Sequence, residues 1–147
     1  LCGKDHGFMP IVVKAVTPDE YRVWVDTQKE AGRAAARAAA AALLKDWSKA
    51  ELMSKGETVY NTICSTCHKP NGLGDKAAGY PAIQGSKVAT GPADAHVALV
   101  LSGNAGTQMA SFATLSDTDL AAVITYQRNA FGNSGSSVQP KTVNAAR

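Results

Sequence analysis

Residues 63–68 read Ile63-Cys64-Ser65-Thr66-Cys67-His68, and the chemistry of this stretch decides how the surrounding chain folds. Two cysteines with two residues between them occur in redox-active dithiols, in one half of a zinc site and in reduced structural pairs. When a histidine follows directly, the same spacing is also that of c-type haem attachment. The flanking sequence has to discriminate among these four possibilities.

The flanking residues favour haem attachment. A zinc site needs a second pair of ligands, but the remaining histidines, His6 and His96, belong to no zinc-type pair. A thioredoxin-like dithiol needs a βαβ context, whereas the flanks here have helical and loop patterns, and a structural pair gives no reason for the histidine. On one helical turn, Cys64 and Cys67 can each add to a porphyrin vinyl group, which places the imidazole of His68 beneath the iron. A carbonyl that accepts a hydrogen bond from its other ring nitrogen would fix that imidazole.

Composition excludes several other functions. The chain has 147 residues, a formal net charge of +3 and 45% hydrophobic residues, which is normal for a globular chain and too weakly basic to indicate nucleic-acid binding. It contains no run of 18 apolar residues, and its longest apolar run, 38–44, is too short to span a bilayer. Because the sequence starts at Leu1 in what reads as the middle of a motif, we expect a processed product or a C-terminal fragment of a longer protein.

Three segments differ in composition. Residues 1–25 contain a cluster of β-branched side chains, which predicts one strand, followed by a helix start at 17–20 with a hydroxyl N-cap, a proline and a glutamate. Residues 26–47 are rich in alanine and predict a helical linker with its basic side chains on one solvated face. Residues 48–147 form the remaining domain, with a globular part to about residue 131 and a tail expected to lie extended on the surface.

The globular part has the pattern of an all-α fold. Ser48 to Glu51 is a capping box that starts a helix running into the Cys-x-x-Cys-His motif, and Ser116 starts the last helix. No strand pattern is present. The predicted elements are the helix from 49, a Gly- and Pro-punctuated loop over 70–92, a short helix over 93–102 ended by Gly103, and a helix ending near 132–133.

These residues resemble a class I cytochrome c, a fold of three to five helices around a covalent haem, over 48–131. In that family a glycine and an aromatic residue four positions later on the first helix pack against the last helix. Gly56 and Tyr60 match this pair, and Val123 and Tyr126 are the expected partners.

The resemblance also implies two contacts behind the haem. The family has a proline, an aliphatic residue and a glycine after the haem loop, which Pro81, Ile83 and Gly85 match. The Pro81 carbonyl is therefore expected to accept a hydrogen bond from His68, and Ile83 is expected to pack on the porphyrin.

Four residues are candidates for the second axial ligand of the haem iron: Met9, Met53, His96 and Met109. Met53 precedes the attachment motif and is expected in the core or on the surface, and His96 is expected on the surface. Met109 lies in a Gly-rich loop before the last helix, where the family supplies its methionine, although Ala110 follows it where many members have proline. The resemblance therefore implies His68 and Met109 as the iron ligands.

The N-terminal stretch has a second ligand pattern. Cys2, His6 and Met9 offer a thiolate, an imidazole and a thioether, the ligand types of copper electron-transfer sites. Their spacing resembles the end of the binuclear copper domain, which is cupredoxin-like, of cytochrome c oxidase subunit II. Only the last three ligands of that pattern are present, so this chain alone is expected to hold an incomplete copper site.

Taken together, the order of segments is similar to bacterial oxidase subunit II with a cytochrome c domain fused at its C-terminus. This resemblance implies electron transfer from a donor, such as cytochrome c or quinol–cytochrome c reductase, through haem c to the binuclear copper and the other oxidase subunits. It also implies a place on the periplasmic face of the bacterial inner membrane. The domain itself would not be catalytic, although the oxidase complex reduces oxygen and translocates protons. A free-standing soluble c-type carrier and, less favoured, a small haem peroxidase remain alternatives, as does a zinc or dithiol module.

Overall fold

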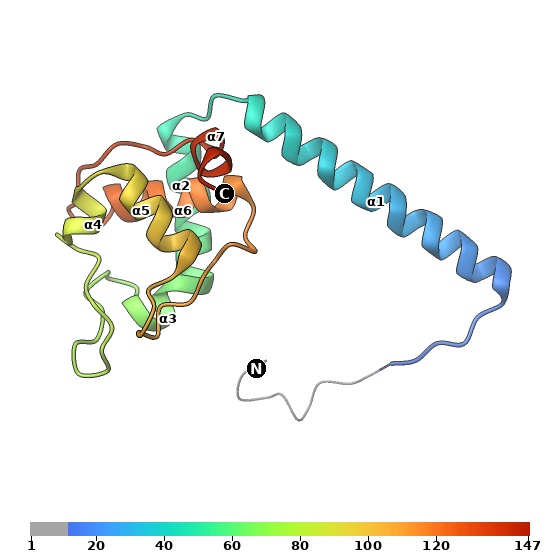
Figure 1. Ribbon diagram of the computed structural model, residues 1–147, viewed down its shortest axis with the longest axis horizontal. Helices are drawn as coiled ribbons and strands as arrows, with labels where there is room; N and C mark the ends of the chain where they lie inside the picture. Colours follow the sequence, from blue (N-terminus) through green and yellow to red (C-terminus); the bar gives the residue numbers. More distant parts are fainter. Residues whose placement is uncertain (1–11) are drawn as a thin grey trace. The chain divides into compact units, whose positions relative to one another are not determined.

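The computed structural model describes residues 12–147 of the 147-residue chain (Figure 1). The copper-ligand pattern of Cys2, His6 and Met9 lies outside the described residues. Contacts divide the chain into two compact units, Leu1–Ala36 and Arg37–Arg147.

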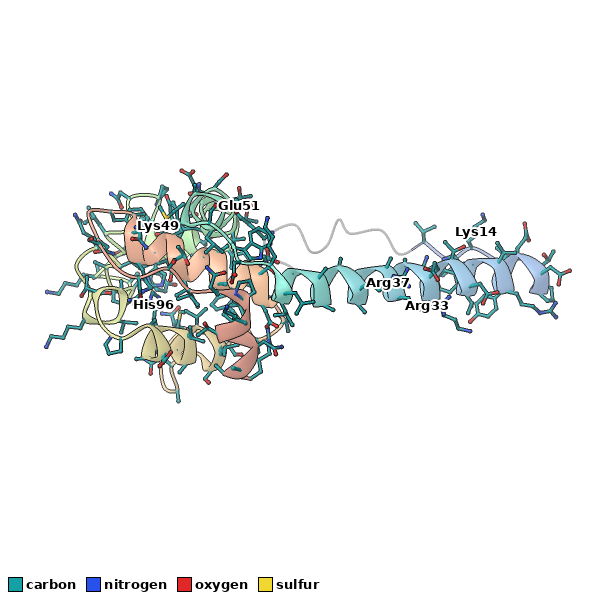
Figure 2. All side chains as sticks on the ribbon, turned by 90° about the horizontal axis from the view of Figure 1, so that it is seen from above. Lys14, Arg33, Arg37, Lys49, Glu51 and His96 are labelled. Atoms are coloured by element: carbon teal, nitrogen blue, oxygen red, sulfur yellow. The ribbon has the colours of Figure 1, made fainter. Side chains whose placement is uncertain are left out.

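The first long helix, α1, spans Pro18–Leu44. It begins as predicted. The Thr17 backbone N–H donates to the Glu20 carboxylate at 2.8 Å, and the Glu20 N–H donates to Thr17 Oγ1 at 3.3 Å. None of its residues is buried. Its exposed surface carries ion pairs three residues apart, such as Arg33 with Glu30 at 2.9 Å, and Figure 2 shows Arg33 and Arg37 projecting from it. Helix propensity and these local pairs, rather than packing, account for the helix.

The predicted strand near the N-terminus is not formed in the part of it that the structure describes. Residues 12–17 have no regular secondary structure, and Val12 and Val13 are more than 80% exposed, at 83% and 89%. A strand needs a neighbouring strand to pair its N–H and C=O groups, and the described residues offer none.

The second unit is helical, as the all-α prediction requires, and residues 37–147 contain no strand beyond an isolated bridge between Asp75 and Tyr80. Ser48 and Ser116 cap their helices with side-chain hydrogen bonds, which confirms both predicted helix starts. The elements after α1 are α2 Lys49–Val59, a π-helical turn Tyr60–Cys64, α3 Ser65–His68, α4 Lys87–Thr90, α5 Ala93–Ser102, α6 Asp117–Asn129 and α7 Pro140–Ala145.

Three sequence-based expectations were wrong in this unit. The loop over 70–92 contains the one-turn helix α4, capped by the Ser86 side chain. The last predicted helix, α6, ends at Asn129 rather than near 132. The tail is not simply extended on the surface, because it forms α7 and buries Val138 and Val143 against the core.

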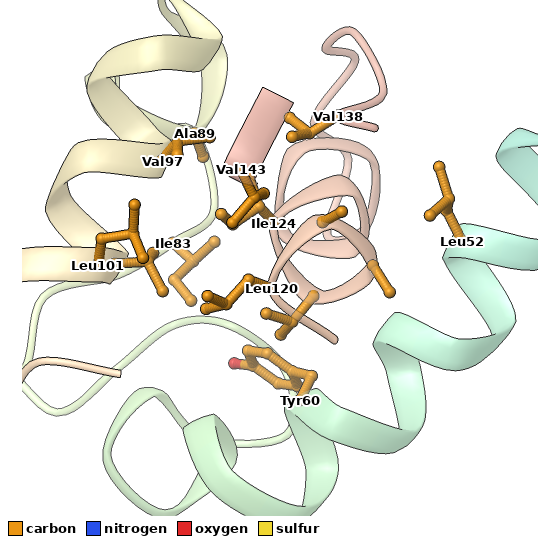
Figure 3. Packing of buried hydrophobic residues seen from close by; sticks show 14 residues of the cluster. Leu52, Tyr60, Ile83, Ala89, Val97, Leu101, Leu120, Ile124, Val138 and Val143 are labelled. Atoms are coloured by element: carbon orange, nitrogen blue, oxygen red, sulfur yellow. The ribbon is translucent and has the colours of Figure 1, made fainter. Parts of the chain in front are cut away.

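The crossing of α2 and α6 forms the centre of the core (Figure 3). At Gly56 a Cβ would overlap the Ala122 carbonyl of α6 and lie 2.8 Å from the Tyr126 Cβ, so the two backbones approach as closely as glycine permits. The Tyr60 ring lies 5.4 Å from the Tyr126 ring, and Val123 is buried in the same hydrophobic cluster. The predicted glycine–aromatic contact with the last helix is therefore confirmed.

The tail is held by polar contacts as well as by apolar burial. The Thr125 hydroxyl on α6 exchanges hydrogen bonds with the Val138 backbone, accepting from its N–H at 2.9 Å. The Gln139 side chain accepts from the Trp47 N–H at 3.0 Å and donates to the Trp47 carbonyl at 2.8 Å. These contacts attach the C-terminal segment to the residues just before α2.

Replacing Gly56 tests the helix crossing. Gly56→Ala should lower the free energy of unfolding by about 1–3 kcal/mol, because the added methyl group has no space at the α2–α6 contact. Urea denaturation of the second unit measures this. Gly32→Ala is the matched control: a Cβ there meets nothing within 4 Å, so unfolding of the second unit should not change. An unchanged midpoint for Gly56→Ala would contradict the close crossing.

Candidate haem site

The Cys-x-x-Cys-His motif lies where the first helix of the domain changes its winding. In the π-helical turn the Ser65 N–H donates to the Tyr60 carbonyl five residues back, and α3 then continues to His68. Such turns are common at functional sites because one extra residue shifts the side chains that follow. Lys69 ends α3 in a left-handed conformation with φ of 62°, and its N–H donates to the Ser65 carbonyl at 2.8 Å. The cysteines and His68 thus lie on one short, well-terminated stretch of helix.

His68 is oriented by the backbone of the following loop. Its Nδ1 lies 2.9 Å from the Pro81 carbonyl oxygen, which confirms the expected contact. A carbonyl oxygen can only accept, so Nδ1 donates and carries the proton. The lone pair of the neutral imidazole is then on Nε2, the nitrogen available to a metal.

The loop that presents Pro81 is held close to His68 by backbone hydrogen bonds. The Gly74 N–H donates to the His68 carbonyl at 2.9 Å, and Asp75 and Tyr80 exchange backbone hydrogen bonds of 2.8 and 2.9 Å. Gly74 has φ of +65°, and a Cβ there would overlap the Tyr80 carbonyl and lie 2.5 Å from the Pro81 oxygen. Glycine at this position therefore permits the approach of the Pro81 carbonyl to the histidine.

A second set of contacts fixes the loop to α6. The Asn133 side chain accepts from the Gly85 N–H at 2.8 Å and donates to the carbonyls of Ile83 at 3.2 Å and Gln127 at 2.8 Å. Ile83 is buried in the core, and its packing on a porphyrin stays a prediction. Sequence reasoning missed the role of Asn133, although a polar residue soon after a buried helix was a signal for such a contact.

All the predicted haem-contacting residues line one cavity of about 430 Å³. That volume lies within the range of binding sites for small molecules and cofactors. Much of the wall is apolar, including Ile63, Val88 and Phe112. The predicted residues on the wall are Cys64, Cys67, His68, Pro81, Ile83 and Met109.

Met109 is held in place by the end of α5. The Asn104 N–H donates to the Met109 carbonyl at 2.9 Å, and a Cβ at Gly103 would lie 2.6 Å from the same oxygen. The Gln108 side chain accepts from the Tyr80 hydroxyl at 2.9 Å, which joins the methionine loop to the loop that presents Pro81. Met109 is half-buried and faces the cavity that His68 also lines.

The rival candidates for the second ligand lie elsewhere or are engaged. Met53 does not line the cavity, and Met9 is outside the described residues. His96 was expected on the surface, and this was wrong: it is 4% exposed and lines the cavity. Its Nε2 is 2.8 Å from Gln127 Oε1 on α6. The position of His96 on α5 faces the core, which the sequence of this largely apolar helix did not reveal.

Burial shifts the pKa values of two residues that line the cavity, His96 and Cys64, and of Tyr60. Burial lowers the pKa of His96 to about 4, with Arg128 acting in the same direction and the hydrogen bond to Gln127 opposing it, so the imidazole is neutral at pH 7. Burial raises the pKa of the Cys64 thiol to about 11, and a hydrogen bond with the Gln127 side chain opposes that rise. Burial also raises the pKa of Tyr60, whose hydroxyl donates to the Lys69 carbonyl at 2.7 Å.

Comparison with known proteins identifies the family of this domain. The family model described as "Cytochrome C oxidase, cbb3-type, subunit III" matches residues 51–126, just over half of the chain. The chain belongs to this family. A cytochrome c domain of this family implies a covalent haem c and haem-based electron transfer. The matched residues include the attachment motif, the Pro81 loop and Met109.

One curated relative matches a short segment. It is "Cytochrome c oxidase subunit 2" of Mycosarcoma maydis, which is 57% identical over 28 residues, 19% of this chain. The match covers 11% of that protein, so the chain spans about a tenth of the length of this relative.

Two further findings concern the described residues 12–147. No group of three or more His, Cys, Asp and Glu side chains is placed there to hold a metal ion. None of the helices in this range is long and apolar enough to cross a membrane.

Gly74 provides a test of the loop that orients His68. Gly79→Ala serves as the control and should lower the free energy of unfolding by about 1 kcal/mol. The positive φ of +81° at Gly79 strains an alanine, but the added Cβ would meet nothing within 4 Å. Gly74→Ala has a similar conformational strain, and its Cβ would also clash with the backbone of Tyr80 and Pro81. It should therefore lower the free energy of unfolding by about 1–3 kcal/mol more than Gly79→Ala does. Urea denaturation and hydrogen exchange of the His68 Nδ1 proton measure the two effects. Equal losses in the two variants would contradict the proposed role of Gly74.

Proposed function

We propose that residues 48–147 carry one covalent haem c and transfer single electrons to the copper centre of a cytochrome c oxidase. Cys64 and Cys67 would form the two thioether bonds, and His68 Nε2 and the Met109 sulfur would ligate the iron. The observation that supports this best is the Nδ1 contact of His68 with Pro81 at 2.9 Å, since it leaves Nε2 as the free ring nitrogen of a residue that lines the same cavity as the cysteines and Met109. When bound, haem c supplies an iron that gains and loses one electron.

The residues of the chain fit this group in three respects. The donor set is that of c-type haem, with two thiols on one turn, an imidazole and a thioether. The cavity wall is largely apolar, which excludes water and favours a low-dielectric site. The carbonyl behind His68 fixes the orientation of the ligand. If His68 and Met109 both ligated the iron, no position would remain for a substrate, which favours electron transfer over a peroxidase reaction.

The partner proposal rests on the N-terminal segment. Cys2, His6 and Met9 match the last three ligands of the binuclear copper site, and a 28-residue segment is similar to an oxidase subunit 2. We therefore propose that the chain is the C-terminal region of a bacterial oxidase subunit II, with its copper domain ending near residue 25, a linker over 26–47 and a fused cytochrome c domain. The acceptor is then the binuclear copper of the full-length subunit, and the domain lies on the periplasmic face of the inner membrane.

The linker has a physical consequence in this arrangement. A tether between donor and acceptor keeps them at a high effective concentration, so that transfer does not depend on diffusional encounter. Residues 26–44 form part of the helix α1, which is exposed along its length and rich in alanine. A helical tether of this kind is a semi-rigid spacer rather than a flexible coil.

The ligand assignment can be tested by optical spectroscopy and carbon monoxide binding. The reduced protein should give the sharp bands of a low-spin haem c and should not bind carbon monoxide rapidly, because both axial positions are filled. Met109→Ala should open one position, so that the ferrous form becomes high-spin and binds carbon monoxide at once. Met53→Ala is the matched control and should leave the spectrum unchanged, since Met53 does not line the cavity.

Two outcomes would contradict this proposal. Rapid carbon monoxide binding by the unmodified protein would favour the peroxidase alternative. An unchanged spectrum in Met109→Ala would remove Met109 from the iron.

A further inference from the structure

A side-chain contact joins the loop that carries Met109 to the loop that orients His68. The Tyr80 hydroxyl lies 2.9 Å from Gln108 Oε1. Tyr80 directly precedes Pro81, whose carbonyl oxygen is the partner of His68 Nδ1. Gln108 directly precedes Met109, and both Tyr80 and Gln108 line the haem cavity. One hydrogen bond therefore connects the two loops on which the proposed iron ligands depend.

The orientation of the Gln108 amide follows from its two partners. The Ala78 carbonyl can only accept, so the NH₂ group of Gln108 faces it, at a longer distance of 3.5 Å. The amide oxygen is then left for the Tyr80 hydroxyl, which donates its proton. In the described part of the chain, these two contacts are the hydrogen bonds that connect residues 103–111 with residues 70–86.

The Tyr80 end of the contact is held by the backbone of its own loop. Tyr80 and Asp75 exchange backbone hydrogen bonds of 2.8 and 2.9 Å. The Asp75 carboxylate also accepts from the Ala78 N–H at 3.2 Å and pairs with Lys69 Nζ at 3.4 Å. Tyr80 thus offers a fixed partner to Gln108.

The Met109 end has little buried surface of its own. Residues 104–108 are all exposed, and Met109 is half-buried. The backbone contacts of Met109 are local, since its carbonyl accepts from the Asn104 N–H at 2.9 Å and its N–H donates to the Thr107 hydroxyl at 3.2 Å. Segments with few buried apolar contacts and exposed hydrogen bonds open locally at a low cost in free energy. Opening of this loop is therefore sensitive to its contact with Tyr80.

We propose that Tyr80 and Gln108 are positioning residues whose hydrogen bond keeps the loop closed and the Met109 sulfur on the haem iron. This inference rests on the proposed function, because it requires Met109 to be an iron ligand. Opening of the loop releases the sulfur and leaves one axial position to a small ligand such as imidazole. In that exchange an iron–sulfur bond breaks and an iron–nitrogen bond forms, and no electron is transferred.

The test is the equilibrium affinity of the ferric holoprotein for imidazole, followed by loss of the sulfur-to-iron charge-transfer band. Imidazole binds only the open form, so its apparent affinity increases with the fraction of open protein. Tyr80→Phe keeps the ring but removes the donor, and Gln108→Met keeps the side-chain length but removes the acceptor. Each variant should raise the affinity about fivefold, the effect of one lost hydrogen bond.

The double variant shows whether the two residues act through one contact. Tyr80→Phe combined with Gln108→Met should bind imidazole as tightly as Gln108→Met alone, because both changes remove the same hydrogen bond. Increases in affinity that multiply would overturn the proposal.

Gln139→Met is the matched control for lost stability. It is the same substitution as at Gln108, and Gln139 also makes two side-chain hydrogen bonds, to the Trp47 backbone, but it does not line the cavity. This variant should unfold at a lower urea concentration and keep the original affinity for imidazole. Tyr80 and Gln108 variants that bind imidazole no more tightly than this control would overturn the inference.

Met109→Ala separates the inference from the proposed function. It removes the ligand itself and should bind imidazole more tightly than either loop variant. If Met109→Ala gained no affinity, the ligand assignment in the proposed function would be wrong. If Met109→Ala gained affinity while Tyr80→Phe and Gln108→Met did not, only the inference would fail.

Discussion

The contact between His68 Nδ1 and the Pro81 carbonyl is the constraint on which the site depends. It joins the end of the attachment helix to a loop thirteen residues further along the chain, and it decides which ring nitrogen is free for a metal. The contact exists because Gly74 has no side chain at the point where the loop returns over the helix. Without this contact the imidazole of His68 could rotate. The hydrogen bond to the Pro81 carbonyl fixes the orientation of the ring.

The helices position that contact rather than form it. The close crossing of α2 and α6 at Gly56 fixes the direction in which the chain enters the π-helical turn. Asn133, which follows α6, holds the haem loop by hydrogen bonds to the backbone of Ile83 and Gly85. Helix α6 therefore lines the cavity directly through Gln127, and Asn133, which follows the helix, holds the Pro81 loop. A change in its packing should affect cofactor geometry as well as stability.

The parts of this structure that depend on local sequence could be predicted, and the parts that depend on tertiary contacts could not. The capping serines at 48 and 116, the short helix over 93–102 and the attachment motif are each encoded within a few residues. The Pro81 contact was predictable only through family resemblance. Helix α7 was missed because its stability comes from burial of Val138 and Val143 against α6, which a polar tail sequence does not show. The burial of His96 was missed for the same reason, since its partner Gln127 is 31 residues away.

The central claim is that Cys64 and Cys67 attach a porphyrin covalently, with His68 beneath its iron. The most direct measurement is the mass of the intact, denatured protein after expression together with haem-maturation machinery, followed by mapping of the peptide that contains residues 63–68. The account predicts one added haem that survives denaturation and maps to both cysteines. A polypeptide of unmodified mass, with two free thiols in that peptide, would contradict it.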